Sequence, residues 1–157
     1  MAVTSASVSV NAEANLGSTL EVQFSARGPQ TWVYVLNEGS TDLAAGEVVI
    51  RNTTSTEYKV IVAPAASISL GLRVIGIAQH AIPAGSYGYV LRRGIGTVKI
   101  GSGAGVSDVD TLTSGGAEAG TLLIKANSAA GAAGMIALAV QNIAASGTGL
   151  AFIDCRG

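Results

Sequence analysis

Apolar and polar residues alternate along short segments of the chain, and glycine-containing stretches separate these segments. Residues 20–25 and 31–36 both alternate in this way and lie on either side of the turn signal Gly28-Pro29. A period of two places successive side chains on opposite faces of a strand, so the two segments predict a β-hairpin. The same pattern predicts further strands at residues 47–52, 57–62, 72–77, 87–92, 96–100, 121–125, 135–140 and 150–154.

The turns between these strands indicate the fold class. Turn signals recur at intervals of about 8 to 12 residues, which is typical of sandwiches and barrels. No segment holds an apolar stripe with helical spacing, and the gaps are too short for crossover helices. The sequence therefore predicts an all-β fold, an antiparallel β-sandwich or barrel with Gly-rich turns and few or no helices. Residues 93–95 are expected to separate two strands, and residues 101–120 to form a polar loop.

The start of the chain differs from the rest. Residues 1–10 are small, β-favouring and uncharged, which is typical of an arm or an edge strand. We therefore expect residues 1–40 to form an N-terminal arm and β-hairpin, and residues 41–157 to form the β-sandwich or barrel core. Such an arm is able to add a strand to a neighbouring chain.

Three short segments share one turn pattern. Each has an apolar anchor, two small residues, a tight turn and a departing strand, and the anchors are Leu43, Ile82 and Ile143. Glycine in such a turn permits a positive φ. The anchors are irregularly spaced, so we interpret the pattern as one turn reused within a single domain rather than as a solenoid.

Composition adds an expectation about assembly. Charged residues make up 12% of the 157 residues, about half of the roughly 25% that is usual for a domain in solution. Hydrophobic residues make up 48%, and the mean hydropathy is +0.47. A chain so poor in charge is expected to cover part of its surface with other chains. The alternative is a monomer with a neutral surface of Gly, Ala, Ser and Thr.

The distribution of charge and of apolar runs excludes two kinds of partner. Nine basic and ten acidic residues give a net charge of −1, and no basic run is longer than Arg92-Arg93. Nucleic-acid binding needs a basic stripe, so no direct contact with nucleic acid is expected. The chain starts without a basic and apolar leader, and no apolar run approaches the roughly 20 residues that span a bilayer. We therefore expect synthesis in the cytoplasm and no membrane partner.

Residues suited to catalysis are few. His80 is the only histidine and Cys155 the only cysteine, so the chain offers little for a nucleophile with its base. Asp108-Val109-Asp110 lacks the run of oxygen ligands that an EF-hand needs. Residues 94–105 are rich in glycine but lack the spacing of a dinucleotide-binding motif. The sequence predicts no catalytic, cofactor-binding or metal-binding residue, no cofactor, and a protein that is not an enzyme.

Five residues are candidates for contact with a partner: Trp32, Tyr34, Tyr87, Tyr89 and Arg92. Aromatic side chains concentrate energy at interfaces, and the alternative for these four is a place in the core. Arg92 and Arg93 end a predicted strand and point to opposite faces, so one of them can meet a partner carboxylate. The alternative for this pair is a solvated strand end.

One stretch of the chain resembles a known family. Residues 71–90 read GLRVIGIAQHAIPAGSYGYV, an apolar strand and a polar link followed by I-x-A-G-x-x-G-x-V, and residues 43–49 read LAAGEVV. This pattern resembles the capsid decoration, or cement, proteins of tailed bacteriophages over residues 42–157. The resemblance implies a β-rich fold, trimers or other homo-oligomers on the outer capsid surface, and no catalysis. No site residue is carried over, because the family has no catalytic motif, and residues 1–40 fall outside the match.

These observations lead to three hypotheses of different classes. The first is a non-enzymatic virion protein that decorates and stabilises the outer capsid by bridging subunits of the major capsid protein. The alternative is a receptor- or glycan-binding module of a fibre or spike, with Tyr87, Tyr89 and Arg92 as its contacts. The third is a hydrolase on a β scaffold, which the single histidine and the lack of paired acids disfavour.

Overall fold

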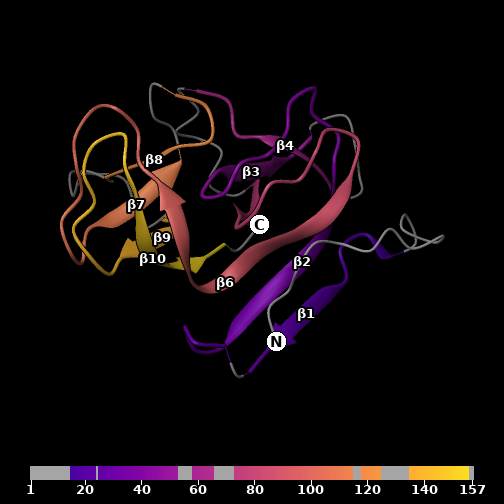
Figure 1. Ribbon diagram of the computed structural model, residues 1–157, viewed down its shortest axis with the longest axis horizontal. Coiled ribbons are helices and arrows are strands. Elements are labelled where there is room, and N and C mark those ends of the chain that lie inside the picture. The colour runs from indigo at the N-terminus through magenta and orange to yellow at the C-terminus, as the bar shows by residue number, and fades with distance from the viewer. Residues whose placement is uncertain are drawn as a thin grey trace.

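A computed structural model describes residues 15–23, 25–52, 58–65, 73–114, 118–124 and 135–155 (Figure 1). All the secondary-structure elements within these ranges are strands, which confirms the predicted all-β fold. The strands are β1 (Thr19–Val22), β2 (Gln30–Asn37), β3 (Val48–Arg51), β4 (Lys59–Val62), β5 (Val74–Ala78), β6 (Tyr87–Lys99), β7 (Thr111–Ser114), β8 (Leu122–Ile124), β9 (Ala137–Ala139) and β10 (Thr148–Asp154). The predicted arm at residues 1–10 lies outside the described ranges.

Five strands close into a ring, called here the first ring. β2 pairs in parallel with β4, and the antiparallel pairs β4–β3, β3–β5, β5–β6 and β6–β2 complete the circle. β1 adds to the outside of this ring as the antiparallel hairpin partner of β2, as predicted. β2 lies before residue 40 and pairs with β4 and β6, which lie after it. The hairpin and the following strands therefore belong to one hydrogen-bonded sheet.

The second half of the chain repeats this pairing scheme in a second ring. β6 pairs with β10, β10 with β9, β9 with β7, and β7 with β8, all antiparallel. A parallel bridge between Ile100 and Leu122 then closes the circle, in the place that the parallel pair β2–β4 takes in the first ring. The long strand β6 belongs to both rings, and Figure 1 shows it running from beside β2 to beside β10.

The turns confirm that the two rings correspond. Leu43 and Ile82 exchange both backbone hydrogen bonds in an isolated bridge, with N–O distances of 3.0 and 3.1 Å. Val106 and Ile143 do the same in the second ring, at 2.8 and 2.9 Å. The sequence pattern identified three of these four anchors. It missed Val106, because the turn after it contains no glycine.

The four turns also share one backbone conformation. The third residue after each anchor has a positive φ, and these residues are Gly46 (86°), Gly85 (72°), Val109 (64°) and Ser146 (57°). Glycine adopts this left-handed conformation freely, whereas a β-branched residue such as valine does so only with strain. The turn geometry is therefore kept in the second ring at a local energetic cost.

Two apolar clusters fill the rings. The smaller cluster lies inside the first ring and consists of Val33, Val35, Leu43, Val49, Val60, Ile75, Ala78, Ile82 and Val90. The larger cluster fills the second ring and includes a row of first-ring residues, among them Trp32, Ile77 and Leu91. The two rings thus share a core as well as a strand.

Two of the sequence predictions about loops are wrong. Residues 93–95 do not separate two strands, because β6 is continuous from Tyr87 to Lys99 and takes up Gly94 at a φ of 116°. Residues 101–120 do not form only a loop, since they contain β7 (Thr111–Ser114). β7 has a mostly polar sequence, yet Leu112, Thr113 and Ser114 are all buried in it.

Among the described residues, no helix is long and apolar enough to cross a membrane.

Candidate functional site

Three of the five predicted contact residues form one aromatic cluster on neighbouring strands. Tyr34 on β2 lies opposite Tyr89 on β6, with ring centroids 5.0 Å apart, and stacks on Tyr87 at 5.8 Å. Tyr34 is buried, whereas Tyr87 and Tyr89 are half-buried. Burial, and then the neighbouring Tyr89 and Tyr87, raise the pKa of Tyr34 above its ordinary value. The half-buried pair keeps part of its surface available to a partner.

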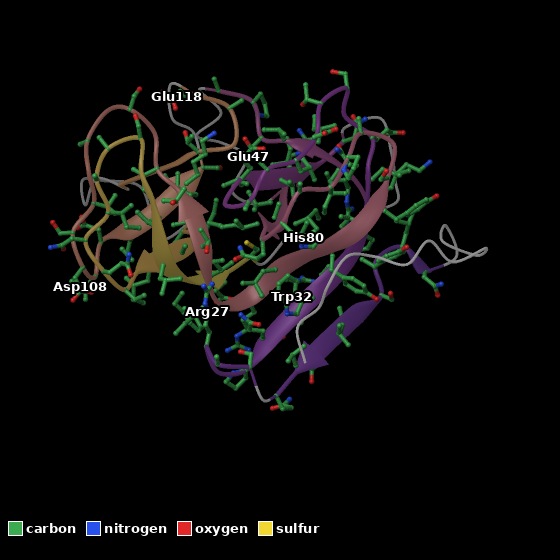
Figure 2. The ribbon with its side chains drawn as sticks, in the orientation of Figure 1. Arg27, Trp32, Glu47, His80, Asp108 and Glu118 are labelled. Carbon is green, nitrogen blue, oxygen red and sulfur yellow. The ribbon has the colours of Figure 1, made fainter. Side chains whose placement is uncertain are left out.

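Trp32 lies on the same side of β2 but is part of the core. It is 8% exposed, pairs with Leu91 across β2 and β6, and joins the larger apolar cluster (Figure 2). Its indole N–H has no hydrogen-bond partner among the described residues, although buried donors of this kind usually have one. The structure places Trp32 and Tyr34 in core packing, the alternative that the sequence left open. A contact role for any of the four aromatic residues stays a prediction.

Arg92 binds the backbone of Cys155, the residue that follows β10. Its guanidinium Nε donates to the Cys155 carbonyl oxygen at 3.2 Å, and the Cys155 N–H donates to the Arg92 carbonyl oxygen at 3.0 Å. A surface pocket of about 380 Å³ lies here, and its lining residues are Thr19, Glu21, Thr31, Arg92, Arg93, Asp154 and Cys155. Positive and negative side chains share this lining, so it favours neither an anion nor a cation.

The two residues best suited to nucleophilic chemistry are unsuited to it in their surroundings. Cys155 is buried, and burial and then Asp154 raise the pKa of its thiol well above the ordinary value, against a smaller opposing effect of Arg92. A thiol of this kind stays protonated and unreactive. His80 is half-buried, and desolvation lowers the pKa of its imidazole.

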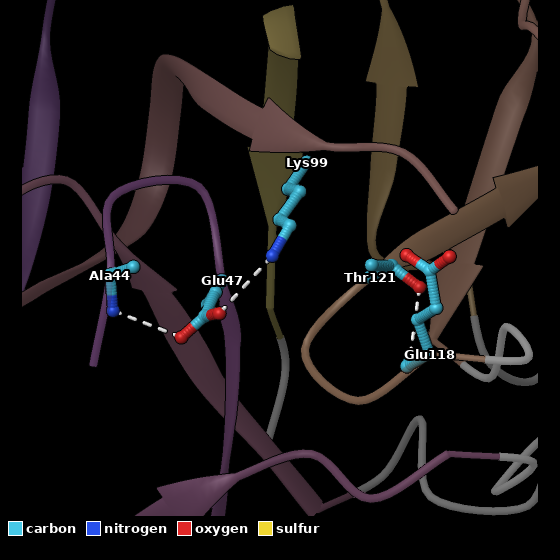
Figure 3. A network of polar contacts seen from close by, with 5 residues as sticks. All are labelled: Ala44, Glu47, Lys99, Glu118 and Thr121. Carbon is cyan, nitrogen blue, oxygen red and sulfur yellow. Dashed lines mark hydrogen bonds and ion pairs between the residues drawn. The ribbon is translucent and has the colours of Figure 1, made fainter. Parts of the chain in front are cut away.

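Glu47 and Asp110 accept hydrogen bonds from backbone N–H groups in corresponding turns of the two rings. Glu47 accepts from the Ala44 N–H at 2.9 Å and pairs with the Lys99 ammonium at 3.4 Å, as Figure 3 shows. Asp110 accepts from the Ser107 N–H at 2.7 Å at the corresponding place of the second ring. No group of three or more His, Cys, Asp or Glu residues within the described ranges could hold a metal ion. Carboxylates used in this way stabilise turns rather than gather at a site.

An exposed apolar face lies on the second ring, and the sequence analysis did not identify it. Its most exposed members are Val109, Val140 and Phe152, with exposed fractions of 71%, 39% and 38%. The signal was present in the chain, because β10 alternates between buried and outward residues and two of its four outward residues, Leu150 and Phe152, are apolar.

The comparisons with known proteins bear on the fold. The sequence matches no model of a known protein family, and no curated protein is similar to it. Among solved structures, the chain is similar to the N base of the head fiber protein gp8.5 of bacteriophage phi29. The TM-score is 0.54 at 14% sequence identity, and the match covers 78% of this chain and 94% of that one. At this identity the likeness establishes a shared fold over nearly the whole neighbour.

Proposed function

We propose that this protein is a non-enzymatic structural component of a bacteriophage virion, bound to the outer surface of the capsid. The observation that carries the proposal is the shared fold with a phage head fiber base, which extends over most of both chains. The composition supports it independently, since 12% charged residues suit a chain that works by packing against other chains.

The finer role that we propose is decoration of the capsid. In this role the protein bridges neighbouring subunits of the major capsid protein and assembles with copies of itself, as a trimer. The buried apolar surface would supply the binding energy, at about 25 cal/mol per Å² before the costs of association. The surroundings of His80 and Cys155 support a role without catalysis.

The second candidate is a fibre or spike module that binds a receptor or a glycan. The description of the structural neighbour as a head fiber favours it. Tyr87, Tyr89 and Arg92 would be its contacts, and two of these are half-buried tyrosines on one strand. In this case the protein attaches to the head and carries a distal part that meets the host.

The test is binding to capsids that lack the protein. Purified chain is added to such capsids from the source phage, the mixture is sedimented, and the bound protein is located by electron microscopy. Under the decoration hypothesis the protein co-sediments at regular lattice positions and raises the temperature at which the capsids break. Absence of co-sedimentation at micromolar protein would refute a capsid role. Binding at a few positions, together with binding to host cells, would favour the fibre module.

A further inference from the structure

Two rows of apolar side chains cover the outer face of the second ring. In one row Phe152 on β10 lies between Ile95 on β6 and Leu138 on β9, as the strand registers place them. In the next row Leu150 on β10 lies opposite Thr97 on β6 and accepts a backbone hydrogen bond from Val140 at 3.2 Å. Of the five apolar residues in the two rows, Phe152 and Val140 are exposed, and Ile95, Leu138 and Leu150 are half-buried. These five residues are called the outer face below.

The alternation along β10 assigns the direction of these side chains. Ala151 and Ile153 are fully buried in the larger cluster, and successive residues of a strand point to opposite faces. Leu150 and Phe152 therefore point away from the core of the second ring. A protein that works alone in solution usually places polar residues on the outward side of such a strand.

Val109 extends the outer face beyond the strands. Its N–H donates to the Ala139 carbonyl at 3.0 Å, which places it next to Val140. It is a β-branched residue with a φ of 64° and a side chain that is 71% exposed. Valine in this conformation is strained, and the corresponding turn of the first ring has Gly46 in its place. The strained, exposed valine adds apolar surface at a position where folding alone favours glycine.

The corresponding row of side chains on the first ring is buried. This row consists of Trp32 on β2, Leu91 on β6 and Ile77 on β5. In the pairing scheme of the second ring, Ile95, Phe152 and Leu138 take the corresponding positions, in the same order. That first-ring row is buried and belongs to the larger cluster together with core residues of the second ring. Within the part of the chain that the structure describes, one copy of this face is covered by the second ring and the other copy stays open.

The charges around the outer face fit a second copy of the chain. The five residues of the outer face carry no charge. Arg93 and Asp154, the next charged residues on β6 and β10, lie directly opposite each other at its edge. An edge that carries both signs can approach another copy of the same chain without net repulsion between like charges, in a dimer or around a three-fold axis.

We propose that the outer face of the second ring is the surface through which this chain binds a second copy of itself. This inference deepens the self-association contained in the proposed function, and it names the residues that carry it. Phe152 is the central anchor, with Ile95 and Leu138 on either side. Val109 and Val140 extend the contact toward the turn of the second ring.

The experiment compares two substitutions of closely matched exposure. Phe152→Lys places a charge in the centre of the outer face, and Leu20→Lys makes the same change on β1, where Leu20 is 36% exposed against 38% for Phe152. Native mass is measured by light scattering over a range of protein concentrations. We expect the unchanged chain and Leu20→Lys to be oligomeric. Phe152→Lys should raise the dissociation constant about 30-fold or more, as loss of a central aromatic anchor does.

Further measurements guard against misfolding and separate this proposal from the proposed function. Val140→Lys, at a residue that is 39% exposed, should also weaken association. Phe152→Lys and Val140→Lys should keep the circular dichroism spectrum of the unchanged chain and should unfold at the temperature of the unchanged chain diluted to the monomer. An oligomer that survives both substitutions, or that only Leu20→Lys disrupts, would overturn the proposal. So would a chain that is monomeric at every concentration, even if it still binds capsids. A chain that forms oligomers through this face but binds no capsid would overturn the proposed function alone.

Discussion

At the scale of single residues, Val109 shows how far the turn geometry constrains the chain. The left-handed conformation costs a non-glycine residue about 1–2 kcal/mol, a cost that glycine avoids. Glycine in turn costs roughly 0.5–1 kcal/mol of stability, because it has more conformational freedom to lose on folding. We predict that Val109→Gly raises the free energy of unfolding by about 0.5–1 kcal/mol. The measurement is urea unfolding in the Phe152→Lys background, where association does not contribute.

Ser146 provides the matched control for this prediction. It occupies the same position of another turn with a φ of 57°, but it is unbranched and exposed. Ser146→Gly should therefore give a smaller gain than Val109→Gly. A loss of stability in Val109→Gly would show that the valine side chain contributes packing within the monomer, against the interpretation given above.

The turns also show what could be read from the sequence at this scale. Leu43, Ile82 and Ile143 were predicted as anchors because glycine or small residues follow each of them, and all three are buried. Val106 was missed because Val109 takes the place of glycine in its turn. The Ile143 turn has Ser146 at this position and was still found, because the residues around it are small. A pattern based on small residues therefore overlooks the one turn whose left-handed residue is bulky.

At the scale of elements, Glu47 connects the first turn of one ring to the end of the strand that both rings share. Its carboxylate accepts from the Ala44 N–H and pairs with Lys99 at the end of β6. We predict that Glu47→Gln lowers the free energy of unfolding by roughly 1 kcal/mol, because the amide keeps one acceptor but loses the charge. The loss should shrink in 1 M salt, which screens the pair in the unchanged protein.

Glu118 is the control for Glu47. It is exposed, and the Thr121 hydroxyl donates to its backbone carbonyl oxygen at 2.8 Å rather than to its carboxylate. Glu118→Gln should leave the melting temperature within measurement error of the unchanged protein. Equal effects of the two substitutions would indicate a general response to charge and would contradict a specific role of Glu47.

Strands with a clear alternation were predictable, and the departures from that rule have physical causes. β2 and β10 were predicted because β-branched, aromatic and aliphatic residues recur along them. β7 was missed because it is buried on both faces and two of its three buried residues, Thr113 and Ser114, are polar, so no apolar alternation marks it. β6 was divided in two because its glycines resemble a turn, whereas the Leu91 side chain occupies the place that a Cβ at Gly96 would take. Small residues on β6 thus reflect close packing between the rings, which no local pattern reveals.

At the scale of the whole molecule, the repeat of the pairing scheme explains both the shared core and the open face. The internal similarity was visible in the sequence only as three turns, because the strands of the two rings differ in nearly every side chain. The duplication became apparent from the hydrogen bonds. Gly46 donates to Ala78 at 2.7 Å in one ring, and Val109 donates to Ala139 at 3.0 Å in the other. The four predicted aromatic contact residues lie on the β2–β6 pair of the first ring, whereas the exposed apolar face lies on the second ring.

The sharing of β6 predicts that the two rings unfold together. Gly149 on β10 lies against its anchor, and an added Cβ would stand 2.5 Å from the Ile143 Cγ1 atom, too close for any real contact. Gly149→Ala should therefore cost about 1–3 kcal/mol, as overpacking of a core does, although alanine usually suits a strand better than glycine. Gly103→Ala is the control, because an added Cβ there meets nothing within 4 Å.

Hydrogen exchange of backbone amides then distinguishes one cooperative unit from two. Because the larger cluster draws side chains from both rings, opening the second ring removes the cover of Trp32 and Leu91 in the first. The free energies of opening for amides of β2 and β10 should agree in the unchanged protein and fall by the same amount in Gly149→Ala. If protection falls in β10 while β2 keeps its full value, the rings unfold separately. The shared strand would then be a covalent link between two independent barrels, and the first ring would be stable without the second.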